Sequence, residues 1–125
     1  MWIYAAVPDE ARQRALEARG ATVIFCPDLK GKVDLRAMLR DLAVREVNEL
    51  HVEAGHKLNG SLLREGVVDE CLVYLAPKLL GEGQGMSNLG PLSELSQGLP
   101  LEFQDIQRIG PDLRILARGA GRDRF

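Results

Sequence analysis

The feature that most constrains the fold is a regular alternation of short apolar runs with longer helix-forming runs in the first half of the chain. Apolar runs of about four to eight residues, bounded by glycine or proline, are typical of buried strands, whereas apolar residues that recur every three or four positions are typical of helices packed on a core. This pattern predicts strands at residues 2–7, 21–26 and 49–53, and helices at 10–19, 35–42 and 57–65. Successive strand–helix units of this kind pair their strands in parallel.

Residues with strong preferences for helix ends mark the predicted boundaries. Asp34 can cap the second helix, because its carboxylate can accept a hydrogen bond from an amide of the first turn. The apolar residues that follow have the spacing of one helix face: Leu35, Met38, Leu39 and Leu42. Gly20 and Gly66 follow the first and third helices, where glycine readily adopts the left-handed backbone that ends a helix.

The second half of the chain has a different organisation. A long strand is predicted at 68–76, a glycine-rich loop at 81–91, and a hairpin whose strands, 101–109 and 113–117, flank the turn Gly110-Pro111-Asp112. The sequence therefore predicts an α/β fold with a mixed sheet, in which a parallel βαβαβα part is followed by an antiparallel C-terminal hairpin. Because the chain contains no repeat and no linker, residues 1–125 are predicted to form a single domain.

Composition narrows the classes of function. The chain is 46% hydrophobic and 27% charged, with a net charge of −2, which is typical of a soluble globular protein and argues against a nucleic-acid partner. The one local basic cluster, Arg118, Arg122 and Arg124, is interpreted as a solvated chain end. Two cysteines, Cys26 and Cys71, make neither a disulfide framework nor a metal site, and free thiols favour the cytoplasm. The first apolar run is too short for a signal peptide or a membrane span.

A candidate ligand site lies where the third predicted strand ends, at Glu53-Ala54-Gly55. In open α/β sheets, ligands bind beyond the carboxyl ends of the parallel strands. A small residue and a glycine let a ligand approach the backbone, and the first amides of the following helix can bind an anion such as a diphosphate. Glu53 could then hydrogen-bond a hydroxyl or amide of the ligand. An alternative from the same pattern is that Glu53 merely caps the helix and that the small residues allow a tight turn.

Several motifs, in order and with compatible spacing, resemble a known family over about residues 33–117. They are Val52-Glu53-Ala54-Gly55, Gly60-Ser61-Leu62-Leu63, Gly66-Val67-Val68-Asp69-Glu70, Ala76-Pro77-Lys78-Leu79-Leu80-Gly81 and Gly110-Pro111-Asp112-Leu113. Together they resemble the C-terminal half of the reductase domain of bacterial bifunctional riboflavin-biosynthesis deaminase–reductases. The resemblance implies a three-layer fold similar to that of dihydrofolate reductase.

The resemblance also implies an activity and its site residues. Proteins of this family use NADPH to reduce the ribose of 5-amino-6-(5-phosphoribosylamino)uracil, a phosphoribosylamino-pyrimidine, to ribityl. By resemblance, Ala54 and Gly55 contact NADPH, backbone amides of His56, Lys57 and Leu58 assist, and Glu53 is a catalytic residue that contacts the substrate or the nicotinamide ribose. A homodimer or higher oligomer is also implied. The alternative function is a non-catalytic, self-associating interaction module derived from the same domain.

The chain departs from the family pattern in two ways. The early part of the reductase domain, which holds substrate-phosphate contacts, has no counterpart here, and His51-Val52-Glu53 matches only the start of the zinc-site motif of the deaminase domain. The 125-residue chain is therefore expected to be a partial reductase domain that is inactive alone.

The remaining polar residues that could carry chemistry have simpler interpretations. A buried core histidine is favoured for His51 over a His–Glu acid–base pair, and an exposed surface histidine is favoured for His56 over a phosphate ligand. A structural role is favoured for Asp69 and Glu70, because neighbours on a strand point to opposite faces.

Overall fold

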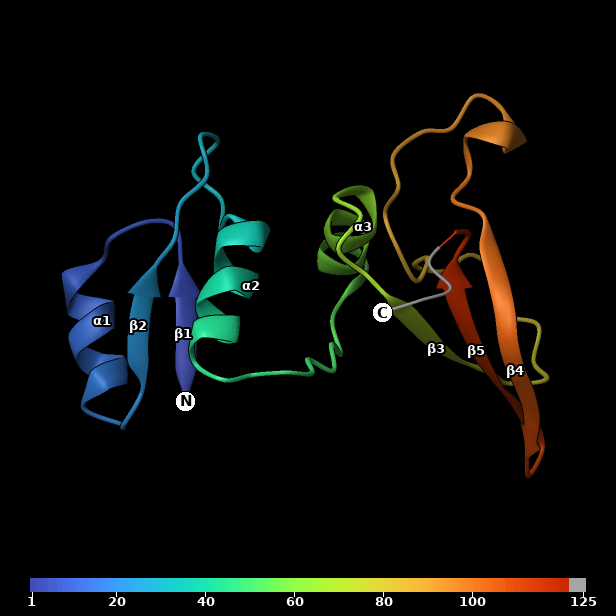
Figure 1. Ribbon diagram of the computed structural model, residues 1–125, viewed down its shortest axis with the longest axis horizontal. Helices are drawn as coiled ribbons and strands as arrows, with labels where there is room; N and C mark the ends of the chain where they lie inside the picture. Colours follow the sequence, from blue (N-terminus) through green and yellow to red (C-terminus); the bar gives the residue numbers. More distant parts are fainter. Residues whose placement is uncertain (122–125) are drawn as a thin grey trace. The chain divides into compact units, whose positions relative to one another are not determined.

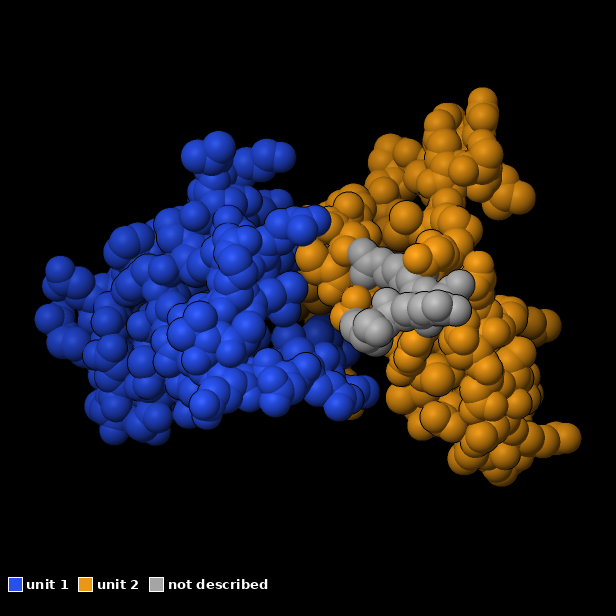
Figure 2. All heavy atoms as spheres, viewed as in Figure 1, with its two compact units in different colours: residues 1–52 blue, residues 53–125 orange. Residues whose placement is uncertain are grey.

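The computed structural model describes residues 1–121, and the chain divides into two compact units, Met1–Val52 and Glu53–Phe125 (Figures 1 and 2). Arg122 and Arg124 of the predicted basic chain end lie outside the described residues. Each unit is described by itself. The single domain expected over residues 1–125 stays a prediction.

The first unit is a parallel βαβ arrangement followed by a second helix, as the sequence predicts. Its elements are β1 (Trp2–Ala5), α1 (Glu10–Glu17), β2 (Thr22–Phe25) and α2 (Leu35–Val44) (Figure 1). The strands β1 and β2 pair in parallel, from Trp2 opposite Thr22 to Ala5 opposite Phe25.

The helix ends of this unit use Asp34 and Gly20, as predicted, together with Asp9. The Arg12 amide donates to the Asp9 carboxylate at the start of α1 (2.9 Å), and the Ala37 amide donates to the Asp34 carboxylate at the start of α2 (2.8 Å). Gly20 turns the chain after α1 with a φ of 80°, a left-handed conformation that glycine adopts without steric cost. These local signals explain why the sequence placed both helices within a few residues.

A polar cluster joins β1 to α2. The Tyr4 hydroxyl donates to the Asp41 carboxylate (2.6 Å), and Asp41 also accepts from the Arg45 guanidinium (2.7 Å). The Arg45 guanidinium lies 5.1 Å from the centroid of the Trp2 ring, within the range of a cation–π contact. The hydrogen bond from Arg45 holds the pKa of Asp41 below its ordinary value, because it stabilises the ionised carboxylate.

The prediction of a third strand at residues 49–53 is wrong for this structure. After α2 the chain turns through Glu46, which has a φ of 65°, and residues 47–55 form neither helix nor strand. Leu50 and Val52 are exposed. An alternating apolar pattern becomes a strand only when its backbone groups pair with a neighbouring strand. Within residues 1–121 the strands form the sheets β1-β2 and β3-β5-β4, and residues 49–53 belong to neither.

The second unit consists of one helix and an antiparallel sheet (Figure 1). Its elements are α3 (His56–Arg64), β3 (Glu70–Leu75), a 3₁₀ turn (Leu95–Gln97), β4 (Leu101–Ile109) and β5 (Asp112–Gly119). The strand order is β3-β5-β4, with an irregularity in register between Phe103 and Asp105. The predicted hairpin is confirmed, and Gly110 at its turn has a φ of 60°.

The strands of the described residues therefore form two sheets, one parallel and one antiparallel, where the sequence predicted one continuous mixed sheet. The α/β class and the presence of both pairing types are confirmed. The single continuous sheet is not confirmed, because the strand expected at 49–53 does not form.

One face of the antiparallel sheet is apolar and only partly covered. Strand alternation and register place nine apolar residues on this face: Cys71, Val73, Leu75, Leu101, Phe103, Ile106, Leu113, Ile115 and Ala117. Ala117 is 1% exposed, whereas Phe103 is 66% exposed and Ile106 is also exposed. The opposite face holds polar pairs between strands, including Glu70 with Arg118. The second unit thus leaves part of its apolar face open to solvent.

Candidate functional site

The predicted ligand turn lies immediately before α3. Gly55 is the N-cap of α3, with extended backbone angles (φ −76°, ψ 164°). Because the N-cap residue is a glycine, it supplies no side-chain cap of its own to this helix. The amides of Leu58 and Asn59 both donate to the Gly55 carbonyl (3.1 Å each). The first two amides of the helix, those of His56 and Lys57, have no intrahelical acceptor.

The charge at the start of α3 is the reverse of what an isolated helix favours. The positive end of a helix dipole favours acidic residues in the first turn. The first turn of α3 contains no acidic residue and instead carries His56 and Lys57. This arrangement weakens the helix slightly but suits an anion placed at its N-terminus.

The turn is also open. A Cβ atom built on Gly55 would have no neighbouring atom within 4 Å. The glycine is therefore required neither by packing within the unit nor by a positive φ. The empty space around Gly55 leaves room for a ligand beside the start of α3.

A loop that follows β3 lies along α3. The Asn88 amide donates to the His56 carbonyl (2.9 Å), and Gln84 contacts the His56 ring. The Arg64 guanidinium contacts the Asn88 carbonyl. A Cβ on Gly60 would overlap the Asn88 backbone, since the Asn88 nitrogen alone would lie 2.6 Å away. The absence of a side chain at Gly60 thus allows the loop to pack directly on the helix.

Asn59 connects the turn with this loop. Its side-chain amide nitrogen donates to the Ala54 carbonyl (3.0 Å) and to the Met86 carbonyl (3.0 Å). The sequence-based prediction missed Asn59, because Met86 lies 27 positions further along the chain. Gly60 did provide a signal, since an isolated glycine inside a helix usually has a packing reason.

The structure brings the predicted site residues together on one short segment, from Glu53 to Leu58. Glu53, Gly55, Lys57 and Leu58 are exposed, while Ala54 and His56 are half-buried. His51 is exposed, so its interpretation as a buried core histidine is wrong. The segment that carries His51 is not the inner strand that this interpretation required. His56 is half-buried against Gln84, so the exposed surface histidine favoured by the sequence is also wrong.

Of the other acidic candidates, Glu70 has a structural role. Glu70 accepts from the Arg118 guanidinium across the sheet (3.1 Å), as expected for a cross-strand ion pair. Asp69 lies just before β3. No group of three or more His, Cys, Asp or Glu side chains in the described part of the chain could hold a metal ion.

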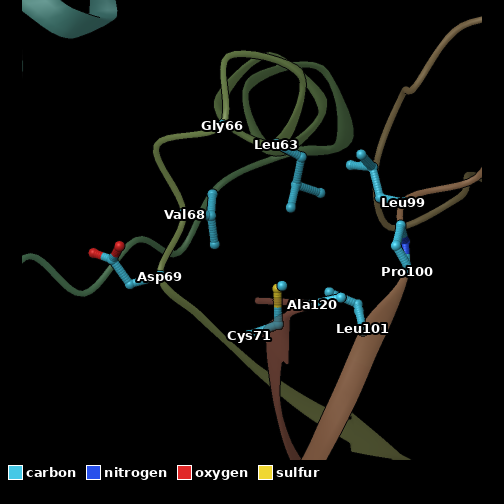
Figure 3. A pocket seen from close by; sticks show the side chains of 10 residues that line it. Leu63, Gly66, Val68, Asp69, Cys71, Leu99, Pro100, Leu101 and Ala120 are labelled. Carbon is cyan, nitrogen blue, oxygen red and sulfur yellow. The ribbon is translucent and has the colours of Figure 1, made fainter. Parts of the chain in front are cut away.

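An apolar cavity of about 210 Å³ lies between α3 and the sheet. Leu63, Cys71 and Leu101 point toward one another inside it, whereas the Asp69 carboxylate points away (Figure 3). Burial raises the pKa of the Cys71 thiol, with a further contribution from the charge of Glu70. A protonated thiol among leucines offers little to a charged ligand, so the turn before α3 is the stronger candidate site.

Comparison with known proteins identifies the family. Residues 1–115 match the family described as the RibD C-terminal domain. The chain belongs to the RibD C-terminal domain family. It is similar to the riboflavin biosynthesis protein RibD of Escherichia coli K12, with 39% identity over 98 residues. It is also similar to a 5-amino-6-(5-phosphoribosylamino)uracil reductase of Buchnera aphidicola from Acyrthosiphon pisum, with 33% identity over 104 residues.

The chain spans only part of these relatives. The matched residues are 78% of this chain but 27% of the E. coli protein, and 82% of this chain but 50% of the Buchnera reductase. The structure of Acinetobacter baumannii RibD, form 2, matches 95% of this chain and 31% of its own, with a TM-score of 0.79 and 24% identity. This likeness supports the RibD C-terminal domain fold. No helix within residues 1–121 has the length and apolar character needed to cross a bilayer.

Proposed function

We propose that this chain is the cofactor-binding half of an NADPH-dependent 5-amino-6-(5-phosphoribosylamino)uracil reductase of riboflavin biosynthesis. The observation that carries the proposal is the start of α3. It combines an open glycine at the N-cap, which offers no side-chain cap of its own, with a first turn that carries His56 and Lys57 but no acidic residue. The name of the Buchnera relative supplies the reaction.

The residues at this turn fit the phosphates of NADPH. Ala54 and Gly55 let the ligand approach the backbone, and the amides of His56 and Lys57 point outward with the dipole of α3 behind them. Leu58 contributes differently, because its amide already donates to Gly55 and its side chain is exposed beside the turn. The Lys57 ammonium adds a charge that attracts phosphate.

Glu53 is proposed as the catalytic residue of this segment. It lies directly before Ala54 and is exposed. Its carboxylate could accept hydrogen bonds from a hydroxyl of the substrate or of the nicotinamide ribose. When bound, NADPH supplies the hydride for the reduction. The role of Glu53 is to orient the reacting partners, so its loss should lower turnover more than cofactor affinity.

Other features of the proposal follow from the family. The intact domain is inferred to have the three-layer arrangement of dihydrofolate reductase and to act in the cytoplasm, which the two free cysteines favour. The chain alone is inferred to be inactive, because it spans half of the Buchnera reductase.

The proposal is tested by titrating the 125-residue chain with NADPH while following nicotinamide fluorescence. We expect saturable binding that weakens with rising salt, since the phosphates meet His56 and Lys57. In the same samples, the phosphoribosylamino-pyrimidine should not accelerate NADPH oxidation. Substrate-dependent oxidation would disprove the inactivity of the chain, and an absence of binding at millimolar NADPH would disprove the cofactor-binding role.

A non-catalytic, self-associating module is the second candidate. The observation that favours it is the partly exposed apolar face of the antiparallel sheet, on which Phe103 and Ile106 are open to solvent. A chain that self-associates but does not bind NADPH in the titration above would support this candidate over the first.

A further inference from the structure

We propose that Asn59 is a positioning residue that couples the Ala54-Gly55 turn to the loop after β3. A primary amide is the one uncharged side-chain group that carries two N–H donors on a single nitrogen. At Asn59, these two donors go to two carbonyls from distant parts of the chain, those of Ala54 and Met86, each at 3.0 Å. The turn and the loop therefore share one side chain.

The loop is held close enough for this coupling to be effective. The contacts between the loop and α3 extend along the helix, from the Asn88 amide on the His56 carbonyl to the Arg64 guanidinium on the Asn88 carbonyl. Gly60 allows the backbones to meet between these points. Because other contacts already hold the loop against the helix, the Asn59 side chain is not required to bring the two segments together. It fixes the position of the Ala54 carbonyl relative to the Met86 carbonyl.

A consequence follows for the proposed cofactor site. A ligand that contacts the Ala54-Gly55 turn will also stabilise the loop around Met86, since both segments depend on the same amide. This consequence rests on the proposed function, whereas the coupling itself does not. Asn59 need not touch NADPH to affect its affinity.

Hydrogen exchange of the cofactor-free chain tests the coupling. The Leu58 amide, which donates to Gly55, reports on the turn, and the Asn88 amide, which donates to His56, reports on the loop. In Asn59→Asp, the shape is kept but both donors are lost. We expect both amides to exchange at least about tenfold faster, while amides of the β4–β5 hairpin keep their rates. Unchanged exchange at either amide would overturn the proposal.

Two further variants separate the coupling from general effects. Asn48→Asp, at an exposed asparagine of the first unit, adds the same charge and should leave both amides unchanged. Asn59→Gln keeps both donors on a longer arm and should restore at least half of the lost protection. If Asn59→Asp loses protection from hydrogen exchange throughout the second unit, exchange in Asn59→Gln decides whether the two donors of the side chain are responsible. Exchange as fast as in the aspartate variant would overturn the proposal.

Cofactor binding provides the last comparison. In the wild-type chain, NADPH should slow exchange at both Leu58 and Asn88, and in Asn59→Asp it should slow exchange at Leu58 alone. Protection of Asn88 by NADPH in the aspartate variant would contradict transmission through Asn59. If the wild-type chain does not bind NADPH, the proposed function fails, while the cofactor-free exchange still tests the coupling.

Discussion

At the level of single residues, the proposed site depends on the side chain that Gly55 lacks. Its backbone is extended, not left-handed, and a Cβ there would meet no other atom. Neither conformation nor packing within the unit explains the glycine. Space for a ligand is the reason that we propose, and it makes the residue suitable for a clean test.

Replacing Gly55 with valine should weaken NADPH binding by about tenfold or more, roughly 1.4 kcal/mol, because a branched side chain occupies the space of the phosphates. The fold should survive, since the side chain meets open space. The measurements are a fluorescence titration with NADPH and thermal unfolding of the same samples. Gly81→Val, at another open glycine without a positive φ, is the matched control and should change neither quantity. NADPH binding by Gly55→Val with the affinity of the wild-type chain would contradict the assignment of this turn as the phosphate site.

Asp41 gives a second prediction at this scale. Its pKa is lowered by the hydrogen bond from Arg45, so the unfolded chain binds more protons than the folded chain at acidic pH. The stabilisation from Asp41 is therefore present above the ordinary carboxyl pKa, near 3.8, and is lost as pH falls through the lower value of the folded state. In Asp41→Asn, the melting temperature should be lower at pH 7 and should fall less between pH 5 and pH 3. Parallel curves for the two proteins would contradict this account.

At the scale of elements, Gly60 sets the distance between α3 and the loop that follows β3. Glycine inside a helix normally costs about 1 kcal/mol relative to alanine, so the usual expectation is that Gly60→Ala stabilises the protein. Here the added methyl group would overlap the Asn88 backbone.

We therefore expect Gly60→Ala to destabilise the second unit, by about 1–3 kcal/mol, as overpacked sites usually do. Urea unfolding followed by circular dichroism measures the change. Gly83→Ala, where a Cβ would meet no atom within 4 Å, should be neutral. An increase in the free energy of unfolding of Gly60→Ala would show that the loop does not rest on the helix.

Elements that are determined by local residues were the ones that could be predicted from the sequence. Asp34 caps α2 and Gly110 turns the β4–β5 hairpin as expected, because a cap or a tight turn depends on neighbouring residues. The strand expected at 49–53 does not form, and neighbouring residues could not reveal this, since a strand depends on a partner elsewhere in the chain. The position of the Glu53-Ala54-Gly55 turn was predicted for its small residues. The hydrogen bonds from the Asn59 side chain could not be predicted, because they link the Ala54-Gly55 turn to the distant loop around Met86.

At the scale of the whole molecule, the uncovered apolar face predicts self-association. Phe103, Ile106 and Leu113 share this face and are exposed, and a second copy of the chain could cover them. We expect sedimentation velocity to show a dimer or larger species at micromolar concentration. Phe103→Glu should shift the distribution toward monomer, whereas Gln107→Glu, on the polar face of β4, should not. A wild-type chain that sediments as a monomer would contradict the prediction.

If NADPH binds at the turn before α3, the amides of that turn should respond to it, and a map of binding along the chain measures this response. The measurement is an NMR titration of the ¹⁵N-labelled chain with NADPH. We expect the largest amide shifts on Ala54–Leu58, with smaller shifts around Met86. Shifts centred on the cavity residues Leu63, Cys71 and Leu101, or no shifts at millimolar NADPH in a folded chain, would contradict it.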